Sequence, residues 1–512
     1  MTSHMTTFTS DGLELEKMVI TISHVQDVEL ESASRRRGFS PEATKKLIRK
    51  MDWNIVPFLA LLYLQVFAAP PPSLSFLDRS NIGNARLAGL EKDLGMHGLE
   101  YNIALAVFFP FYVLAEVPSN MMMKRTRPSL WISIIMIAWG VCMTLMGLVK
   151  NYKGLLISRM ALGFAEGGLF PGVTFYITLW YARHECGLRM ALFFSAATMA
   201  GAFGGLLARG IVEMDGLGGL NGWAWIFILE GLATIIAAAV AYFMINDYPQ
   251  TAKFLTSDEK AEVQRRLKAD RSSLADEFDL RYFFDAVKDW KIYVYMVIAI
   301  GVYTPLYSFS LFLPTIVKNM GYTDSTSQLM TVPPYIVACM FTIGIGYLAD
   351  LHRQRGVCMA LSSVLGSIGF LFLLSSPRPQ IQYCGTFFAA CGVYPCIPMI
   401  TAWTGNNIGG STKRGVAIAM QVGFGNLGGV VAAFSYRYTD APRYVSGHAL
   451  LVGTCLLSAA GSACLSVYLR RENRRRDAVM RENNRSVEGL TEHEMEEERG
   501  RGDYASFFRY TV

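Results

Sequence analysis

Apolar residues are gathered into long runs along this chain, and most charged residues lie in the segments between them. A helix needs about 20 mainly apolar residues to cross roughly 30 Å of hydrocarbon. Twelve runs satisfy that requirement: 53–77, 101–123, 129–149, 153–181, 190–214, 222–246, 291–317, 328–349, 357–376, 381–404, 413–437 and 446–469. The pattern predicts an all-α integral membrane protein whose twelve transmembrane helices form two six-helix halves, the build of a secondary transporter.

The predicted spans divide the chain into five parts. They are a tail at 1–50, an N-terminal half at 51–246, a charged central loop at 247–290, a C-terminal half at 291–469 and a second tail at 470–512. No apolar run of the signal-peptide type lies within 1–50, so we expect the first span to act as the insertion signal. Lys and Arg gather before the first span, in alternate loops and after the last span, which predicts that both termini are cytoplasmic.

Composition agrees with the membrane prediction and excludes several other classes. Charged residues make up 17% of the chain, against about 25% in soluble proteins. The net charge of +6 follows from the basic loops and forms no single patch for nucleic acid. The nine cysteines form no CxxC pair and no Cys/His metal spacing, so we predict neither a metal nor a cofactor. We find no nucleophile triad, catalytic carboxylate pair or phosphate loop and expect no enzyme activity.

Glu166 is the clearest functional candidate, because a charged side chain at mid-bilayer costs roughly 2.5–3.5 kcal/mol on insertion scales. It lies halfway along the fourth predicted span. Arg159 and Gly163 precede it by seven and three residues and share its helical face. Desolvation favours the neutral form of a carboxyl near pH 7, so Glu166 can exchange a proton as a symporter requires. The alternative is a structural pair of Glu166 with Arg159.

Arg79 is the second candidate and follows the first span, beside Asp78 and Asn81. If it faces a cavity, its guanidinium offers a two-pronged grip for the carboxylate of an organic anion. We count Asn81 with it as a candidate substrate contact. The alternative is an interfacial arginine that pairs with Asp78 at the outer membrane boundary, and position alone leaves both open.

Other charged residues inside the spans favour structural roles. Glu116 lies about two turns from the basic loop after the second span, which favours pairing with that loop. We also expect Glu230 to be structural and Arg209 to extend toward the outer surface. At the end of the eighth span, Gly346, Asp350 and Arg353 suggest a gate whose charges lock two helices in one state. The alternative is the ordinary enrichment of basic residues in a cytoplasmic loop.

Residues 346–355 resemble the cytoplasmic signature of the major facilitator superfamily, although Leu351 and His352 replace part of its usual basic run. Further stretches narrow the resemblance. They are 76–95, 116–120, 159–172, 222–231, 403–407 with Lys413 and Arg414, and 440–444 with Gly447 and His448. Over about residues 51–470, the combination resembles the fungal allantoate permease branch of the anion:cation symporter family.

Members of that branch move small organic anions such as nicotinate, allantoate, pantothenate and biotin with protons across the plasma membrane. The resemblance implies that Arg79 binds the anion and that Glu166 couples its movement to protons. It also implies that Asn407, in the asparagine motif of the tenth span, lines the cavity.

Residues 65–74 depart from the family pattern, because they lie between stretches that are usually adjacent. Pro70, Pro71 and Pro72 cannot continue a helix, since each lacks an amide donor. We interpret the ten residues as an unspliced fragment or a non-standard gene model. If they are genuine, they displace Arg79 from the cavity. A second departure is Arg209, where an uncharged residue is expected.

Together these observations predict a multi-pass plasma-membrane protein, a monomer, that takes up a small organic anion with protons by alternating access. Its partners are the anion, protons and the lipid bilayer. The alternative is a nutrient sensor of the same fold that signals through its tails, although the composition of 470–512 is typical of disorder. A drug exporter fits less well, because the resemblance is to an uptake-type branch.

Overall fold

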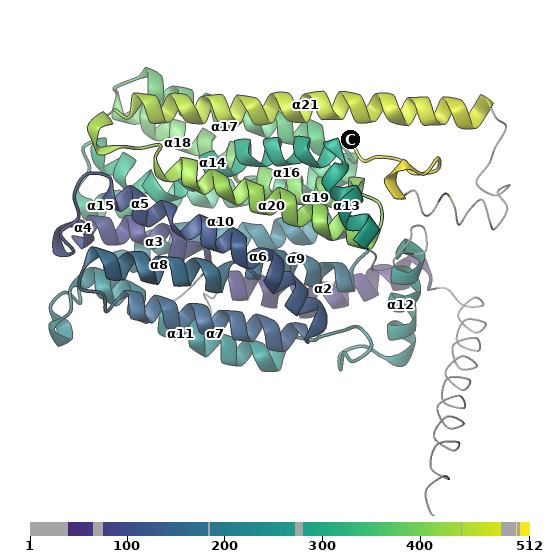
Figure 1. The fold of residues 1–512 in the computed structure, drawn as a ribbon, viewed down its shortest axis with the longest axis horizontal. Coiled ribbons are helices and arrows are strands. Elements are labelled where there is room, and N and C mark those ends of the chain that lie inside the picture. Colours follow the sequence, from purple (N-terminus) through teal and green to yellow (C-terminus); the bar gives the residue numbers. More distant parts are fainter. Residues whose placement is uncertain are drawn as a thin grey trace, which may run out of the picture.

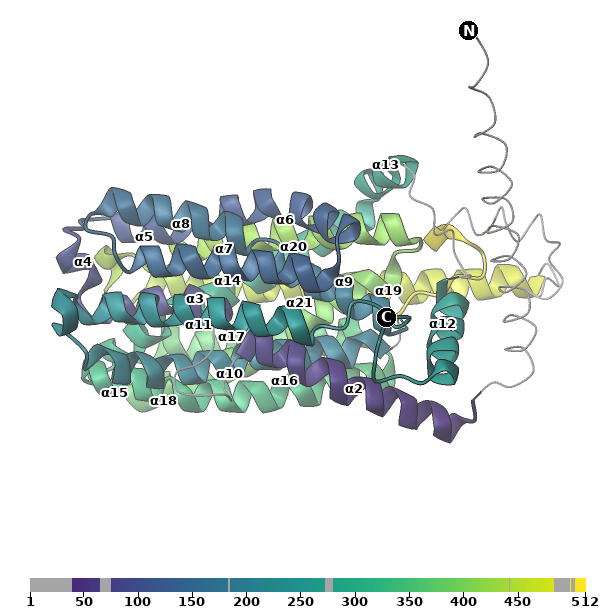
Figure 2. The same cartoon turned by 90° about the horizontal axis from the view of Figure 1, so that it is seen from below.

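The structure, a computed structural model, describes residues 39–64, 75–182, 185–271, 280–441, 443–482, 498 and 502–512. Every regular element in these residues is helical, so the predicted all-α fold is confirmed. Most helices run along the longest axis of the molecule (Figure 1). Helices α4 (Leu90–Asp93) and α15 (Asp324–Met330) lie at one end, here called the α4 end. Helix α12 (Ser257–Arg271) lies at the other, the α12 end (Figure 2).

Helices from the two halves of the sequence occupy two sides of the bundle, the earlier ones below and the later ones above in Figure 1. The first side holds α2 (Pro41–Leu64), α3 (Ser75–Leu87), α4, α5 (Glu100–Ala106), α6 (Phe108–Arg125), α7 (Pro128–Met146), α8 (Tyr152–Glu166), α9 (Leu169–Trp180), α10 (Cys186–Val212) and α11 (Gly222–Met244). The second holds α13 (Leu280–Lys288), α14 (Trp290–Asn319), α15, α16 (Val332–His352), α17 (Arg355–Ser375), α18 (Pro379–Val393), α19 (Cys396–Asn407), α20 (Ser411–Ala433) and α21 (Val445–Glu482).

Nine helices among the described residues are long and apolar enough to cross a membrane. They coincide with the predicted second, third and sixth to twelfth spans. The first predicted span contains residues 65–74, which lie outside the described residues, and several side chains of the fifth, within α10, are not described. The fourth is divided into α8 and α9. The total of twelve spans therefore stays a prediction.

Large apolar side chains cover the outside of the bundle. Phe243 is 83% exposed, and Ile157, Leu361 and Met340 are each more than 60% exposed. Water would make such a surface costly, because soluble monomers rarely expose large contiguous apolar patches. The surrounding medium that suits these side chains is hydrocarbon, as expected of a protein that spans a membrane.

Ion pairs attach α12 to the rest of the α12 end. Lys50 of α2 donates to Glu259 of α12 at 2.7 Å, and Arg266 of α12 donates to Glu185 at 2.5 Å. Burial alone would raise the pKa of Glu259, but the hydrogen bond and charge of Lys50, together with hydrogen bonds involving Thr256, outweigh it and hold the pKa below its ordinary value. The charged segment between the halves therefore packs against the start of α2 and the start of α10.

Helix α21 is longer than the last predicted span and continues as a helix to Glu482. Residues 502–512 fold back and pack against the α12 end, with Asp503 and Ala505 fully buried. The expectation of disorder for the 470–512 tail is therefore wrong for these described parts. Buried ion pairs and backbone hydrogen bonds, described below, supply the stabilisation that composition alone does not reveal.

Candidate transport site

Helix α8 places the predicted polar face inside the bundle. Arg159 and Glu166 are 2% and 1% exposed, and Gly163 between them is also buried. The helix ends at Glu166, and α9 begins at Leu169. Pro171 explains the interruption, because it has no amide hydrogen to donate to the carbonyl of Gly167 one turn earlier. Glu166 thus lies at a break in the helix rather than within a continuous span.

Glycines bring α8 into backbone contact with α6. A Cβ atom on Gly163 would lie 2.4 Å from the carbonyl oxygen of Phe108, and one on Gly167 would lie 2.3 Å from that of Tyr112. No larger residue fits at either position without moving a helix. The contact places the end of α8, where Glu166 lies, beside the first turns of α6, the helix that carries Glu116.

Glu116 is 1% exposed and lies where the two sides of the bundle meet. Its Oε2 atom is 3.5 Å from the position that a Cβ atom on Gly423 of α20 would occupy. The structure therefore places this carboxylate between α6 and α20, a location that the sequence pattern does not reveal. A carboxylate at such an interface can respond to movement of one side of the bundle against the other.

Arg79 and Asn81 are the two candidate anion contacts after the first span, and the structure describes only the side chain of Asn81. The side chain of Arg79 lies outside the described residues, as does that of Arg209. Asn81 is fully buried in α3 and donates a hydrogen bond to Oε2 of Glu230 on α11. Asn84 donates to Oδ1 of Asn81 at 3.3 Å. Asn81 thus links two helices of the same side, and Glu230 has the structural contact that we expected of it.

The two sides are in close contact toward the α4 end. Asn102 of α5 donates to the carbonyl oxygen of Ala433 at the end of α20, at 2.5 Å. A Cβ atom on Gly83 of α3 would lie 2.6 Å from the carbonyl oxygen of Leu311 in α14. Backbone-level packing of this kind closes the path between the sides at these helices.

At the α12 end, the predicted gating residues lie where α16 meets α10. A Cβ atom on Gly346 would lie 2.8 Å from Cβ of Ala191, and one on Gly187 would lie 2.5 Å from Oδ1 of Asp350. Asp350 accepts from Nη2 of Arg355 at 2.6 Å. The close approach of α10 and α16 therefore depends on two glycines next to a charged pair.

Arg353 does not form that pair, contrary to what its place in the predicted cluster suggests. It is exposed and ends α16 in a left-handed conformation, with φ of 53°. Arg355 is 4% exposed and also donates to the carbonyl oxygen of Ala402 at 3.0 Å. The turn at Arg353 brings Arg355 back toward Asp350, so the second arginine of the motif supplies the ion pair.

The first side carries a similar pair that the sequence did not suggest. Arg189 of α10 donates from Nε and Nη2 to the two oxygens of Asp52 on α2, at 2.9 and 2.7 Å. A two-pronged contact of this kind fixes both side chains. Asp52 and Arg189 are 137 residues apart, so no local sequence spacing predicts this ion pair.

Asn407 lies at the α12 end of α19 and is 1% exposed. Its amide nitrogen donates to the hydroxyl of Tyr295 and to the carbonyl oxygen of Thr511, both at 2.8 Å. Its amide oxygen accepts from the backbone N–H of Thr511 at 2.7 Å. In this structure, residues 502–512 therefore occupy the hydrogen-bonding groups of the predicted substrate contact.

Comparison with known proteins agrees with this architecture. A family model described as Major Facilitator Superfamily matches residues 73–433. The MFS-type transporter cnsO of Penicillium expansum is 37% identical over 456 residues, which are 86% of each chain. The MFS transporter prlL of a fungal species (strain NRRL 50135) is 36% identical over 473 residues, 90% of this chain and 93% of that relative. The crystal structure of a D-xylose-proton symporter has the same fold, with a TM-score of 0.60 at 12% identity, and covers 80% of this chain and 97% of that one.

Proposed function

This chain belongs to the Major Facilitator Superfamily, and from that premise we propose that it takes up a small organic anion together with protons by alternating access. Its relatives are named as transporters, so the chain is a multi-pass membrane transporter and not an enzyme. The proposal adds the coupling ion, the substrate class, the plasma membrane as location and a monomer as the working unit.

Proton coupling rests on one observation, the burial of Glu166. Glu166 is 1% exposed in a helix of a membrane bundle, and α8 ends at this residue. Burial favours the neutral acid, whereas contact with water or a cation favours the carboxylate. A change in access from one side of the membrane to the other therefore drives protonation and release of the proton. In this proposal Glu116, at the contact between α6 and α20, senses the same movement.

An organic anion as substrate is supported by the residues after the first span and in the tenth span. The proposal gives Arg79 the role of holding the carboxylate, because a guanidinium binds both of its oxygens. Asn81 and Asn407 are the amide candidates on the two sides of the bundle. The α12 end, which holds Arg189, Arg355 and Lys413, faces the cytoplasm under the positive-inside rule.

The test is uptake of labelled nicotinate, allantoate, pantothenate and biotin into yeast cells that lack their own transporters. Uptake of at least one should rise as external pH falls from about 7 to 5, and a protonophore should abolish its accumulation. Glu166→Gln should prevent accumulation yet preserve exchange of labelled for unlabelled substrate. Glu213→Gln, the same change at an exposed position, is the matched control.

Uptake that continues unchanged in the presence of a protonophore would reject proton coupling. Uptake of none of the four anions would reject the substrate class as stated. Saturable binding of one of them to the purified protein without any flux would instead support the nutrient sensor.

A further inference from the structure

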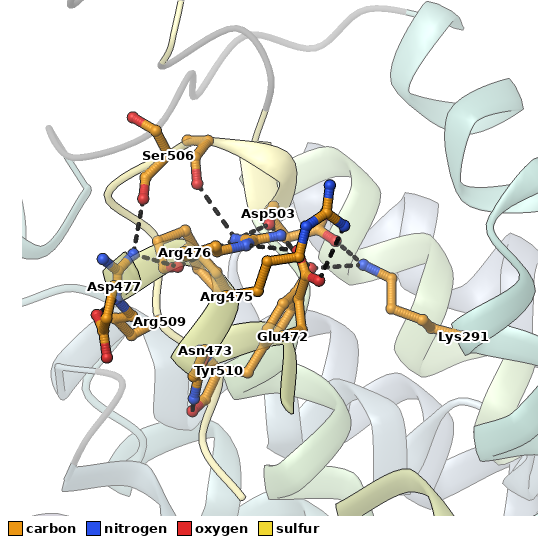
Figure 3. Close-up of polar contacts among 12 residues, drawn as sticks. Lys291, Glu472, Asn473, Arg475, Arg476, Asp477, Asp503, Ser506, Arg509 and Tyr510 are labelled. Atoms are coloured by element: carbon orange, nitrogen blue, oxygen red, sulfur yellow. Dashed lines mark hydrogen bonds and ion pairs between the residues drawn. The ribbon is translucent and has the colours of Figure 1, made fainter. Parts of the chain in front are cut away.

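Residues 502–512, called the 502–512 segment below, lie across the α12-end termini of α14, α19, α20 and α21. Figure 3 shows part of this contact, with Lys291 on one side of the segment and α21 on the other. Lys291, Asn407, Lys413 and Arg476 come from the four helices in turn and all bind the segment. These four residues are separated by up to 185 positions in the sequence, from 291 to 476. The folded segment therefore joins helix ends that the chain itself does not connect locally.

A buried group of four charges is the centre of the contact. Lys413 donates to Asp289 and to Asp503, both at 2.7 Å, and Lys291 also donates to Asp503. All four side chains are at most 6% exposed. Two ammonium groups and two carboxylates sum to zero, and removal of Asp503 leaves a net charge of +1 in the buried group. An uncompensated buried charge is strongly unfavourable, so the two lysines require a carboxylate here.

Asp503 is held as a carboxylate by these contacts. Burial alone would raise its pKa, but the ammonium groups of Lys291 and Lys413 outweigh that effect and hold the pKa below its ordinary value of 3.8. Lys291 also lies 4.2 Å from the ring centroid of Tyr504 and donates to the hydroxyl of Tyr510 at 3.0 Å. The lysines therefore contact both the acidic residue and the aromatic residues of the segment.

Two asparagines recognise the backbone of the segment. Asn407 donates to the carbonyl oxygen of Thr511 and accepts from its N–H, and Asn473 does the same for Tyr510 at 2.8 and 2.9 Å. Trp403 adds a second donor to the carbonyl oxygen of Thr511, at 2.9 Å. Each amide side chain therefore satisfies a donor and an acceptor of one residue, as a neighbouring strand would.

The close approach of the 502–512 segment also requires a glycine in the turn between α19 and α20. A Cβ atom on Gly409 would lie 2.3 Å from the backbone nitrogen of Asp503. Gly502, with φ of 61°, takes a conformation that favours glycine and turns the chain toward the lysines. Fit at the level of backbone atoms indicates a built site and not an accidental contact.

We propose that the α12-end termini of α14, α19, α20 and α21 form a binding site for an acidic, aromatic peptide, and that the 502–512 segment is its ligand within the same chain. The bound segment holds the four helix ends together and occupies Asn407 and Trp403. Residues 483–501 connect it to α21, so tethering raises its local concentration at the site. The site recognises one carboxylate through two lysines and two peptide units through two asparagines. This inference does not depend on proton coupling or on the identity of the substrate.

Hydrogen exchange of the segment in the purified full-length chain tests the proposal directly. Asp503→Asn keeps the size of the side chain and removes its charge. We expect exchange of residues 502–512 to become at least about tenfold faster, because two buried lysines lose a counter-charge. Asp477→Asn is the matched control, because Asp477 pairs with Arg509 of the segment at 2.8 Å but is 50% exposed. The control should change exchange by less than about threefold, since exposed pairs contribute little.

A compensating variant separates charge from shape. In Asp503→Asn combined with Lys413→Gln, the remaining Lys291 and Asp289 balance each other, so exchange should slow again relative to Asp503→Asn alone. A synthetic peptide of residues 500–512 should bind the chain from which 502–512 is deleted and should not bind the full-length chain. The same peptide with Asn at position 503 should bind at least about tenfold more weakly.

Exchange in Asp503→Asn that is as slow as in the unchanged chain would overturn the proposal, as would failure of the compensating variant to slow it. If the deletion variant does not fold, these two measurements on the full-length chain decide the question. All of them can fail while the pH-dependent uptake experiment succeeds, and the reverse also holds.

Discussion

Gly346→Ala should separate α16 from α10 and destabilise the protein, because Gly346 lies at a close contact between these helices near the α12 end. The added Cβ atom would lie 2.8 Å from Cβ of Ala191, and ordinary van der Waals contact begins at 3.4–4 Å. The difference requires the helices to move apart by about 0.6–1.2 Å, since neither Cβ atom can rotate away from its backbone. Overpacking of this kind costs about 1–3 kcal/mol.

Two further variants make the reasoning specific to this contact. Gly344→Ala, two residues earlier on the same helix, introduces a Cβ atom with nothing within 4 Å and should be neutral or slightly stabilising. Ala191→Gly removes the opposing carbon, so the double variant with Gly346→Ala should recover most of the lost stability. The coupling free energy between the two positions should be about 1–2 kcal/mol.

Unfolding by SDS in mixed micelles measures the free energy of unfolding for the unchanged chain and the four variants, and uptake in cells measures transport. Because the α10–α16 contact joins the two sides of the bundle, uptake should fall in Gly346→Ala and recover in the double variant. Equal stability of Gly346→Ala and Gly344→Ala would refute the argument. So would a double variant that is no more stable than Gly346→Ala.

Two other predictions concern charges at the α12 end. Asp350→Asn should lower the free energy of unfolding by about 1.5–3 kcal/mol and reduce uptake, because the buried Arg355 loses its charged acceptor. Arg353→Gln, at an exposed position, should change the free energy of unfolding by at most about 0.5 kcal/mol. Equal effects of the two variants in SDS unfolding would contradict the assignment of the ion pair to Arg355. Docking of the 502–512 segment should be constant between pH 7.5 and 5, because docking lowers the pKa of Asp503. The contribution of Asp503 to the stability of the docked state is complete above the ordinary pKa of 3.8. It is lost only as the pH falls through the lower pKa of the docked state. Hydrogen exchange corrected for its intrinsic pH dependence measures this, and a loss of protection between pH 7.5 and 5 would show that another group controls docking.

Much of the arrangement of spans follows from local sequence. An apolar run long enough to cross the bilayer has one low-energy conformation there, because a helix satisfies every backbone hydrogen bond within the segment. The helices Gly222–Met244 and Arg355–Ser375 accordingly lie close to the expected spans. The division of the fourth span was harder to predict from the sequence. Pro171 indicates that the helix is weakened nearby, but the break lies at least three residues before it, after Glu166.

Candidate polar residues could be named from sequence, but their contacts could not. A carboxylate inside an apolar run is visible in the sequence, so Glu116, Glu166 and Glu230 were identified without coordinates. Their partners and surroundings come from other helices: Asn81 contacts Glu230 across 149 positions, and Gly423 lies beside Glu116. Such distant contacts have no spacing rule, because each depends on how whole helices pack.

The sequence by itself determined the class of this protein: apolar runs predicted its helices, basic loops predicted its orientation, and motif residues indicated its family. These are local properties, set by the cost of placing polar groups in hydrocarbon. Only the tertiary structure decided which charges meet, that Arg355 rather than Arg353 binds Asp350, and that residues 502–512 return to Lys291 and Lys413. The physical reason is that a buried charge is stable wherever a counter-charge reaches it, and the folding of the whole chain determines which residue does.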